Sequence, residues 1–162
     1  MTTHQKISTC LWFDDNAEEA IGFYISVFKD SKLLSVLRNG DQGPGPKGSL
    51  LAATFQIEGQ QIEVINGGPT FKLSEAVSLV VRCADQQEVD RLWDKLGDGG
   101  RYQPCGWLKD RFGLSWQIVP SVLYELLQDP DQAKAGRAMQ ALLQMQKIDI
   151  ARLQRAAAGA AG

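Results

Sequence analysis

Apolar and polar residues follow the same order in two stretches of this chain, and each stretch predicts a strand followed by a helix. A strand-like run at Ile7–Phe13 precedes a helical pattern over Asn16–Phe28, and a run at Val77–Cys83 precedes one over Asp85–Leu96. In each helix the apolar residues recur at i, i+3, i+4 and i+7, which places them on one side. The two stripes, 69 positions apart (20 to 89), are Ala20, Phe23, Tyr24, Val27 and Val89, Leu92, Trp93, Leu96. The repeat predicts two similar modules, with any ligand site between them.

Both predicted helices begin with the same capping pattern. Asn16 is followed three residues later by Glu19, and Asp85 is followed at the same spacing by Glu88. These side chains satisfy backbone N–H groups that the first helical turn leaves without partners. We therefore predict helix caps at Asn16 and Asp85.

The rest of each module is strand-like, which predicts an α+β fold built from two modules of one strand, one helix and further strands. The second module has shorter strands, at Trp107–Asp110 and Ser115–Val119. After its helix the first module continues with a strand at Ser31–Asn39 and a flexible loop, rich in glycine and proline, at Gly40–Gly48. A hairpin follows, with its two strands at Ser49–Ile57 and Gln61–Ile65.

After Pro120 the pattern becomes helical. Helices are predicted at Ser121–Gln128 and Asp149–Ala156, and another begins at Asp129–Pro130, because proline suits the first helical turn. The closing AAAGAAG predicts a frayed end. We expect residues 1–120 to hold the paired modules, at about 6–68 and 76–120, and residues 121–162 to form a helical tail. The apolar stripe of the middle helix is Ala135, Met139, Leu142 and Leu143.

Composition and charge narrow the class of protein. The chain has 162 residues, of which 44% are hydrophobic and 22% charged, and its net charge is −2. No basic surface argues for nucleic acid, and no apolar run is long enough to cross a membrane. The polar start MTTHQKIS lacks the apolar core of a signal peptide, so we expect a cytoplasmic protein. The three cysteines fit neither a disulfide framework nor a metal knuckle, and Cys10 and Cys83 are predicted to be small buried residues.

Several long segments resemble one protein family. CLWFDDNAEEAIGFYISVF, GPGPKGS, INGGPTFK, CGWLKDRFGLSWQIVP and the closing MQALLQMQKIDIARLQRA are similar to the PhnB-like group of the vicinal oxygen chelate superfamily. That superfamily includes glyoxalase I, bleomycin-resistance proteins and extradiol dioxygenases, and the group carries the label 3-demethylubiquinone-9 3-methyltransferase-like. The resemblance implies tandem βαβββ modules forming a cupped mixed sheet with C-terminal helices, and a homodimer.

The resemblance also implies where a metal would bind in metal-using relatives. Those positions fall on Thr9 (or Ser8) and Ser78 (or Val77) in the first strands of the modules, and on Glu63 and Gln117 in the last strands. Hydroxyls and a neutral amide are poor ligands for transition metals. The one histidine, His4, precedes the first strand, so we expect no metal and no cofactor.

A methyl-transfer reaction is also not favoured by the sequence. A site for S-adenosylmethionine of the doubly wound kind needs a glycine-rich turn between a strand and a helix. Gly40–Gly48 joins two predicted strands and Asn66–Gly68 leads into a loop, so neither segment opens a helix.

The polar residues at the implied positions still predict a ligand site. Strand alternation places Thr9 and Ser8 on opposite faces of the first strand. Burial in a cup with few positive neighbours disfavours the charged form of Glu63, which then acts as a general base or accepts a hydrogen bond; the alternative is a Glu63 that faces solvent.

Trp107 follows Cys105 and lies next to Lys109 and Asp110, so this segment either lines the mouth of the site or is a structural turn with Lys109 and Asp110 exposed. Cys105 lacks a histidine base for covalent catalysis. Asn66-Gly67-Gly68 either presents N–H groups to an anion or forms a plain turn.

Three functions remain open from these observations. The first is metal-independent binding of an apolar or aromatic small molecule in the cup, by aromatic side chains and the cluster Thr9, Ser78, Glu63 and Gln117. The second is an enzyme that acts on a small metabolite with Glu63 as base, as a glyoxalase-like isomerase or lyase or as the methyltransferase of the family label. The third is an interaction module whose cup is filled by its own side chains.

Overall fold

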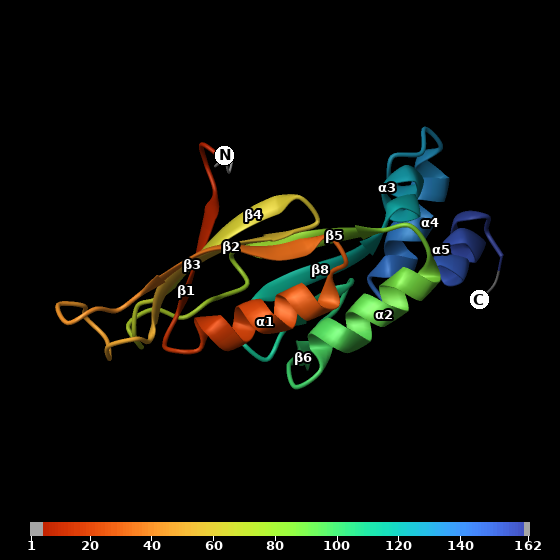
Figure 1. Ribbon diagram of the computed structural model, residues 1–162. Coiled ribbons are helices and arrows are strands. Elements are labelled where there is room, and N and C mark those ends of the chain that lie inside the picture. Colours follow the sequence, from red (N-terminus) through yellow and green to blue (C-terminus); the bar gives the residue numbers. More distant parts are fainter. Residues whose placement is uncertain (1–4, 161–162) are drawn as a thin grey trace. The chain divides into compact units, whose positions relative to one another are not determined.

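The structure, a computed structural model, describes residues 5–160 and consists of two compact units, one ending at Leu73 and the other beginning at Ser74 (Figure 1). The first unit contains β1 (Thr9–Phe13), α1 (Ala17–Val27), β2 (Ser31–Arg38), β3 (Leu50–Ile57) and β4 (Gln60–Asn66). The second contains β5 (Ser78–Cys83), α2 (Gln86–Gly97), β6 (Arg101–Tyr102), β7 (Trp107–Lys109), β8 (Ser115–Pro120), α3 (Ser121–Leu127), α4 (Gln132–Leu142) and α5 (Ile150–Ala157).

Each unit has its own mixed sheet of four strands. The strand orders are β1-β4-β3-β2 in the first unit and β5-β8-β7-β6 in the second. The outer pairs β1–β4 and β5–β8 are parallel, and the other neighbours are antiparallel. The predicted α+β class, with two βαβββ modules and C-terminal helices, is confirmed.

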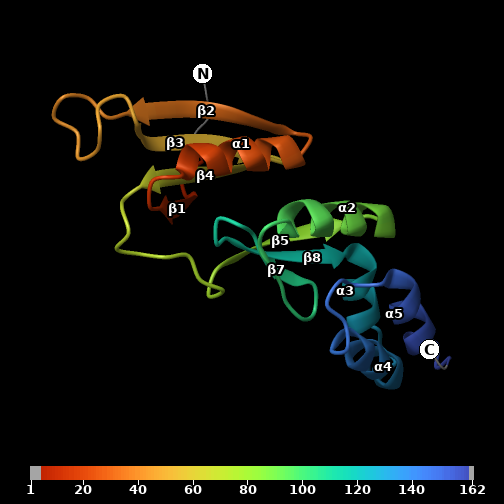
Figure 2. The same cartoon turned by 90° about the horizontal axis from the view of Figure 1, so that it is seen from below.

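Helix α1 lies along one face of the first sheet (Figure 2). Its stripe is buried as predicted at Ala20, Tyr24 and Val27, because alternate residues of the strands offer apolar side chains to it. Tyr24 stacks on Phe55 of β3 with ring centroids 6.0 Å apart. The strands contribute Leu11, Phe13, Ala53, Phe55, Ile57, Ile62 and Val64 to this core.

Helix α2 covers one face of the second sheet with the predicted stripe Val89, Leu92, Trp93 and Leu96, all buried. Trp93 also stacks on Tyr102, with ring centroids 4.9 Å apart. Tyr102 belongs to the two-residue strand β6, for which the sequence predicted no element. So short a strand contains no alternation from which it can be predicted. Trp116 and Ile118 of β8 and Leu108 of β7 complete this core.

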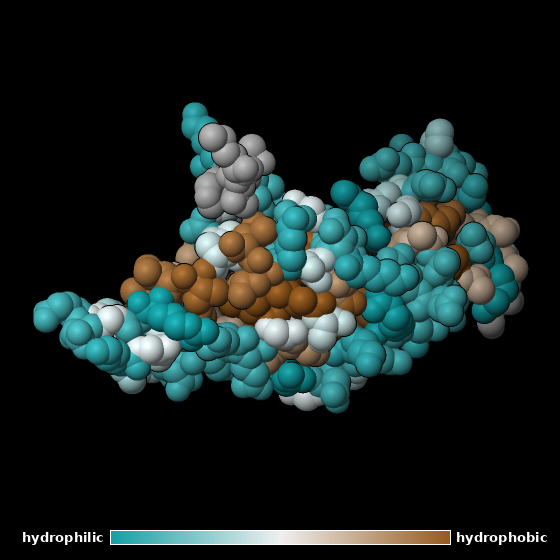
Figure 3. All heavy atoms as spheres, viewed as in Figure 1, coloured by the Kyte–Doolittle hydropathy of each residue, from teal (hydrophilic) through white to brown (hydrophobic). Residues whose placement is uncertain are grey.

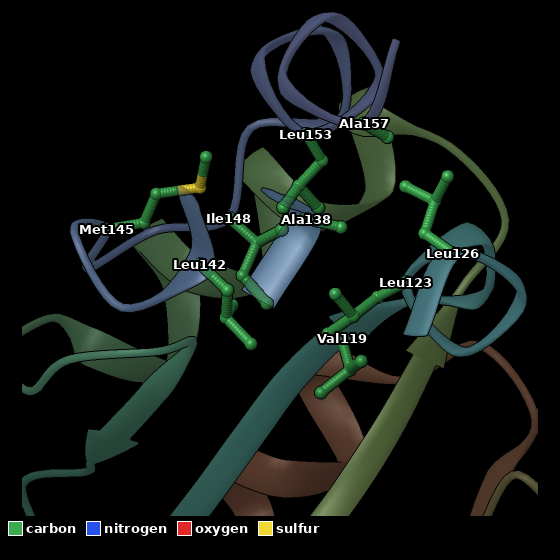
Figure 4. Close-up of a cluster of buried hydrophobic side chains, with 9 residues drawn as sticks. All are labelled: Val119, Leu123, Leu126, Ala138, Leu142, Met145, Ile148, Leu153 and Ala157. Atoms are coloured by element: carbon green, nitrogen blue, oxygen red, sulfur yellow. The ribbon is translucent and has the colours of Figure 1, made fainter. Parts of the chain in front are cut away.

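The three C-terminal helices bury a separate apolar cluster against the end of β8 (Figure 4). The predicted stripe of α4 is partly wrong, because Leu142 is buried but Met139 and Leu143 are exposed. Alanines occur on several sides of α4, so the pattern alone did not decide which side faces inward. The cluster consists of Val119, Leu123, Leu126, Ala138, Leu142, Met145, Ile148, Leu153 and Ala157.

The helix caps confirm some predictions and correct others. Asp85 caps α2 by accepting a hydrogen bond from the Glu88 N–H at 2.9 Å, as predicted. Asn16 makes no side-chain cap on α1; instead Asn66 Oδ1, at the end of β4, accepts from the Ala17 N–H at 3.0 Å. Helix α4 begins two residues after the predicted proline, because the Asp131 carboxylate accepts from the N–H groups of the first turn.

Candidate functional site

Strand register decides which polar residues share the sheet faces opposite α1 and α2. Residues in register on neighbouring strands project from the same face of a sheet. Cys10 is in register with Glu63, and Val80 is in register with Gln117. The counterpart of Cys10 is therefore Val80, 70 positions later (10 to 80), although the helices repeat at 69.

A difference in connection length explains this offset. Three residues separate β1 from α1, whereas two separate β5 from α2. A slip of one residue moves every side chain of a strand to the other face. The predicted equivalence of Thr9 with Ser78 is therefore wrong, and Ser8 is the counterpart of Ser78. Thr9 is in register with the fully buried Ile62 and so lies on the face toward α1, not beside Glu63.

In the first unit, Ser8 and Glu63 form a hydrogen-bonded pair. Ser8 Oγ donates to Glu63 Oε1 at 2.5 Å. Glu63 is exposed within this structure, which suits a hydrogen-bonding carboxylate better than a base buried in an apolar cup. Cys10, which was predicted to be buried, is exposed beside Glu63. Partial desolvation and then the negative charge of Glu63 raise the pKa of the Cys10 thiol, so it is protonated at neutral pH.

A hollow of about 280 Å³ surrounds Glu63 on this face. All four strands of the first sheet contribute to it, because the face opposite α1 carries their small and apolar side chains. Sequence reasoning missed most of its members, since they lie on different strands and form no motif. Their side chains include those of Cys10, Ser35, Leu37, Ala52, Thr54, Glu63 and Ile65.

The second unit has an equivalent pair on the face opposite α2. Gln117 Nε2 donates to Ser78 Oγ at 2.9 Å, and Trp107 is in register with Gln117. The structure thus places three of the predicted site residues, Ser78, Gln117 and Trp107, on one face; their role in binding stays a prediction. Ser115 is in register with Ser78, and its buried Oγ has no hydrogen-bond partner among the described residues.

Lys109 and Asp110, which follow Trp107, have separate structural roles. Lys109 Nζ pairs with Glu75 Oε1 at 2.9 Å. Hydrogen bonding from Lys109, and then from other donors including Gln103, lowers the pKa of Glu75 to about 2. Asp110 is buried rather than exposed, and accepts hydrogen bonds from the backbone N–H groups of Phe112 and Leu114 and from Trp116 Nε1, at 2.9 to 3.0 Å.

Cys105 belongs to a turn that holds the C-terminal helices. Its φ of 63° is in the left-handed region, and its N–H donates to the Met145 carbonyl at 2.8 Å. Its thiol is half-buried against the C-terminal cluster and 3.7 Å from the Leu142 carbonyl oxygen. This environment fits the structural turn, one of the two roles predicted for the segment, and ligand binding by Cys105 stays a prediction.

The segment Asn66-Gly67-Gly68 is also occupied by structural hydrogen bonds. Besides capping α1, Asn66 donates through Nδ2 to the Leu50 carbonyl at 3.1 Å. The Gly67 and Gly68 N–H groups donate to the carbonyls of Phe13 and Asp14 at 2.9 and 3.1 Å. Because the backbone already uses the N–H groups of Gly67 and Gly68, the segment fits the plain turn, one of its two predicted roles, and ligand binding by Asn66 stays a prediction.

Among residues 5–160, no group of three or more His, Cys, Asp or Glu side chains is placed to hold a metal ion. His4, the one histidine of the chain, lies outside the described residues. No helix in the same range is long and apolar enough to span a membrane.

A family model described as 3-demethylubiquinone-9 3-methyltransferase matches residues 5–119. The chain belongs to this family. The family's PhnB protein from Bacillus cereus is 36% identical in sequence, with a TM-score of 0.67, and the alignment covers 72% of this chain and all of that one. The search of curated proteins returned no match. The predicted PhnB-like membership of the vicinal oxygen chelate superfamily is confirmed.

Two more distant structures share the fold. Protein PA1353 from Pseudomonas aeruginosa is 23% identical, with a TM-score of 0.61, over 72% of this chain and 98% of that one. The fosfomycin resistance protein FosX from Listeria monocytogenes is 15% identical, with a TM-score of 0.57, over 80% of this chain and all of that one. The match to the 3-demethylubiquinone-9 3-methyltransferase family ends at the end of β8, so it contains both polar pairs, and α3, α4 and α5 follow it.

Proposed function

We propose that this protein binds a small molecule without a metal ion, using the sheet faces that lie opposite α1 and α2. The observation that carries the proposal is the pair of equivalent contacts Ser8–Glu63 and Ser78–Gln117. Ser8 directly precedes β1 and Ser78 begins β5, and each bonds to a residue in the last strand of its own module. Hydrogen-bonding groups set among apolar side chains are typical of sites that orient a small ligand.

The residues around the Ser8–Glu63 and Ser78–Gln117 pairs support this proposal. In the first unit the hollow around Glu63 offers apolar walls for a ligand. In the second unit Trp107 adds a half-buried aromatic surface beside Gln117, and Val80 is 46% exposed. The buried Ser115 hydroxyl, in register with Ser78, is a further group that a ligand or a water molecule would satisfy.

The donor set does not fit a transition metal or a methyl donor. The two pairs offer two hydroxyls, one amide and one carboxylate, and transition metals prefer imidazole, thiolate and carboxylate. The glycine-rich segment 40–48 connects β2 to β3, and 66–68 follows β4, so neither opens a helix at which S-adenosylmethionine is bound in doubly wound folds.

An enzyme with Glu63 as base is the second candidate, and one asymmetry favours it. The first module has a carboxylate where the second has the neutral amide of Gln117, so one of the two equivalent positions can accept a proton. Ser8 holds this carboxylate through a short hydrogen bond. In this reading Glu63 takes a proton from a bound metabolite in an isomerase or lyase reaction.

A thermal-shift and calorimetric screen tests the proposal. The full-length protein is screened against aromatic and quinone-like metabolites, S-adenosylmethionine and divalent metals, and we expect an organic compound to raise the melting temperature. The hit is then titrated against Glu63→Leu and Gln117→Leu. Weaker binding by either variant supports a ligand on the sheet face that carries the substituted residue. A rise with metal only, or no rise with any compound, would overturn the proposal.

Measuring turnover of the bound compound distinguishes the binding protein from the enzyme with Glu63 as base. For a neutral ligand, a binder keeps most of its affinity in Glu63→Gln, because the amide oxygen still accepts a hydrogen bond. An enzyme loses far more turnover than affinity, since the amide cannot take a proton. The control is Glu19→Gln, which changes an exposed carboxylate on α1, on the side of the first sheet opposite Glu63.

A further inference from the structure

The charge of the hollow in the first unit limits the ligands it can take. Among the described residues that line it, Glu63 supplies the one carboxylate, and neither lysine nor arginine is present. The nearest cation along β2 on the same face is Lys32, which is in register with Gln56 and lies outside the lining. A ligand in this hollow therefore meets a negative charge that no neighbouring lining residue offsets.

The polar atoms of the hollow are suited to a hydrogen-bond donor. Glu63 accepts from Ser8 through Oε1, and an ionised carboxylate has lone pairs for further donors. Thr54 is in register with Glu63 on the neighbouring strand β3, and Ser35 is in register with Thr54 on β2. Their hydroxyls can both donate and accept, so they fit a ligand hydroxyl or amine that bonds to Glu63.

The remaining lining is apolar and matches a small ring. Leu37, Ala52 and Ile65 lie on the same face, and Leu37 is 59% exposed. Cys10 adds a polarizable thiol, and its raised pKa keeps it uncharged. At about 280 Å³ the hollow is just below the range of about 300–1,000 Å³ that is usual for ligand pockets in proteins.

From these features we infer that the ligand of this hollow is a small apolar molecule that carries a hydroxyl or amine donor and no negative charge. The inference rests on the proposed function and assigns the chemical class of its ligand. An anionic ligand would be placed against Glu63 without a compensating cation, which costs binding energy. A molecule without a donor would leave the Glu63 carboxylate desolvated and without a new partner.

Four matched probes of one ring size test the inference. They are p-cresol, 4-methylbenzylamine, 4-methylanisole and p-toluate, which differ only in the polar group. Binding to the full chain is measured by NMR titration, with the amides of Thr54 and Glu63 as reporters. We expect p-cresol and the amine to bind at least about tenfold more tightly than the ether and the carboxylate, as is typical of a hydrogen bond to a charged group.

Two substitutions of Glu63 separate charge from hydrogen bonding. Glu63→Gln keeps an acceptor but removes the charge, so the amine should lose at least about tenfold in affinity and p-cresol less. Glu63→Leu removes both and should abolish the preference for p-cresol over the ether. Glu19→Leu, an exposed substitution on α1, is the control and should change no affinity.

The outcomes distinguish this inference from the proposed function. Binding of p-toluate as tight as that of p-cresol would overturn the inference, as would an unchanged affinity of p-cresol in Glu63→Leu. If none of the four probes moves the reporter amides while another compound of the screen binds elsewhere, the inference fails and the proposed function stands. If no compound of either set binds, both fail.

Discussion

At the scale of single residues, the buried carboxylate of Asp110 holds the β7–β8 turn in place. It is 3% exposed and accepts from two backbone N–H groups and from Trp116 Nε1. Asp110→Ala removes these acceptors and leaves buried donors without partners, so we expect a loss of about 2–4 kcal/mol in the free energy of unfolding. Urea unfolding measures this loss. Asp94→Ala, an exposed change on α2, should stay within about 0.5 kcal/mol of the native protein; equal effects of both changes would contradict the assigned role.

Glu75 gives a prediction for pH dependence. Its pKa is lowered from the ordinary 4.5 to about 2, first by the hydrogen bond from Lys109. A lowered pKa means that ionised Glu75 stabilises the fold above about pH 4.5, and that this contribution is lost as the pH falls toward 2. An NMR titration of the side-chain carboxyl should show a midpoint near 2 that rises in Lys109→Met. Lys134→Met, which removes the partner of Asp129 instead, should leave the Glu75 midpoint in place.

The residue scale also shows what the sequence could not decide at the site. Glu63, Ser78 and Gln117 were predicted because hydrophobic alternation and the family resemblance locate the first and last strands of each module, whereas Trp107 was predicted from the polar and charged residues beside it. Thr9 was chosen over Ser8 because helix periodicity is easily counted across a repeat, whereas the length of the connection before the helix is not. One extra residue in that connection reverses the face of the strand.

At the scale of elements, the apolar stripes of α1 and α2 were predictable for two reasons. Each helix has a strong apolar periodicity, and the strands that it packs against have apolar residues at alternate positions. Helix α4 was less predictable, since alanine suits a buried side and an exposed side alike. The capping of α1 by Asn66 joins residues far apart in the chain, and a local capping pattern contains no signal of it.

Gln86 of α2 bonds to the segment at the start of α5, beside an ion pair between Asp90 of α2 and Lys147. Gln86 Oε1 accepts from the Ile150 N–H at 2.8 Å, and Gln86 Nε2 donates to the Ile148 carbonyl at 3.0 Å. In Gln86→Ala we expect a loss of about 1–3 kcal/mol. Hydrogen exchange should become faster in α5 while α1 is unaffected, because the contact supports only that docking. Gln87→Ala, its exposed neighbour on α2, serves as control, and equal exchange in the two variants would count against the contact.

At the scale of the whole molecule, the expected homodimer stays a prediction, and strand β2 suggests where it would form. This strand is at the edge of the first sheet, and its Leu33, Val36 and Leu37 are 49%, 41% and 59% exposed. Figure 3 shows apolar side chains gathered over this part of the first unit. Edge strands with exposed apolar residues are open to pairing with a second chain, which would bury them.

Leu33→Lys tests this surface, because two lysines brought to a symmetric interface would repel each other and remain poorly solvated. Sedimentation velocity of the native protein should show a dimer, and the variant should sediment as a folded monomer at the same concentration, with unchanged circular dichroism. The matched control is Leu143→Lys, which places the same charge on an exposed leucine at the end of α4, in the other unit. A native protein that sediments as a monomer, or a Leu33→Lys dimer as tight as the native one, would contradict an interface on β2. Because the hollow around Glu63 includes Leu37 of the same strand, ligand affinity should be measured in both variants, and a fall in Leu33→Lys alone would connect dimer formation with binding.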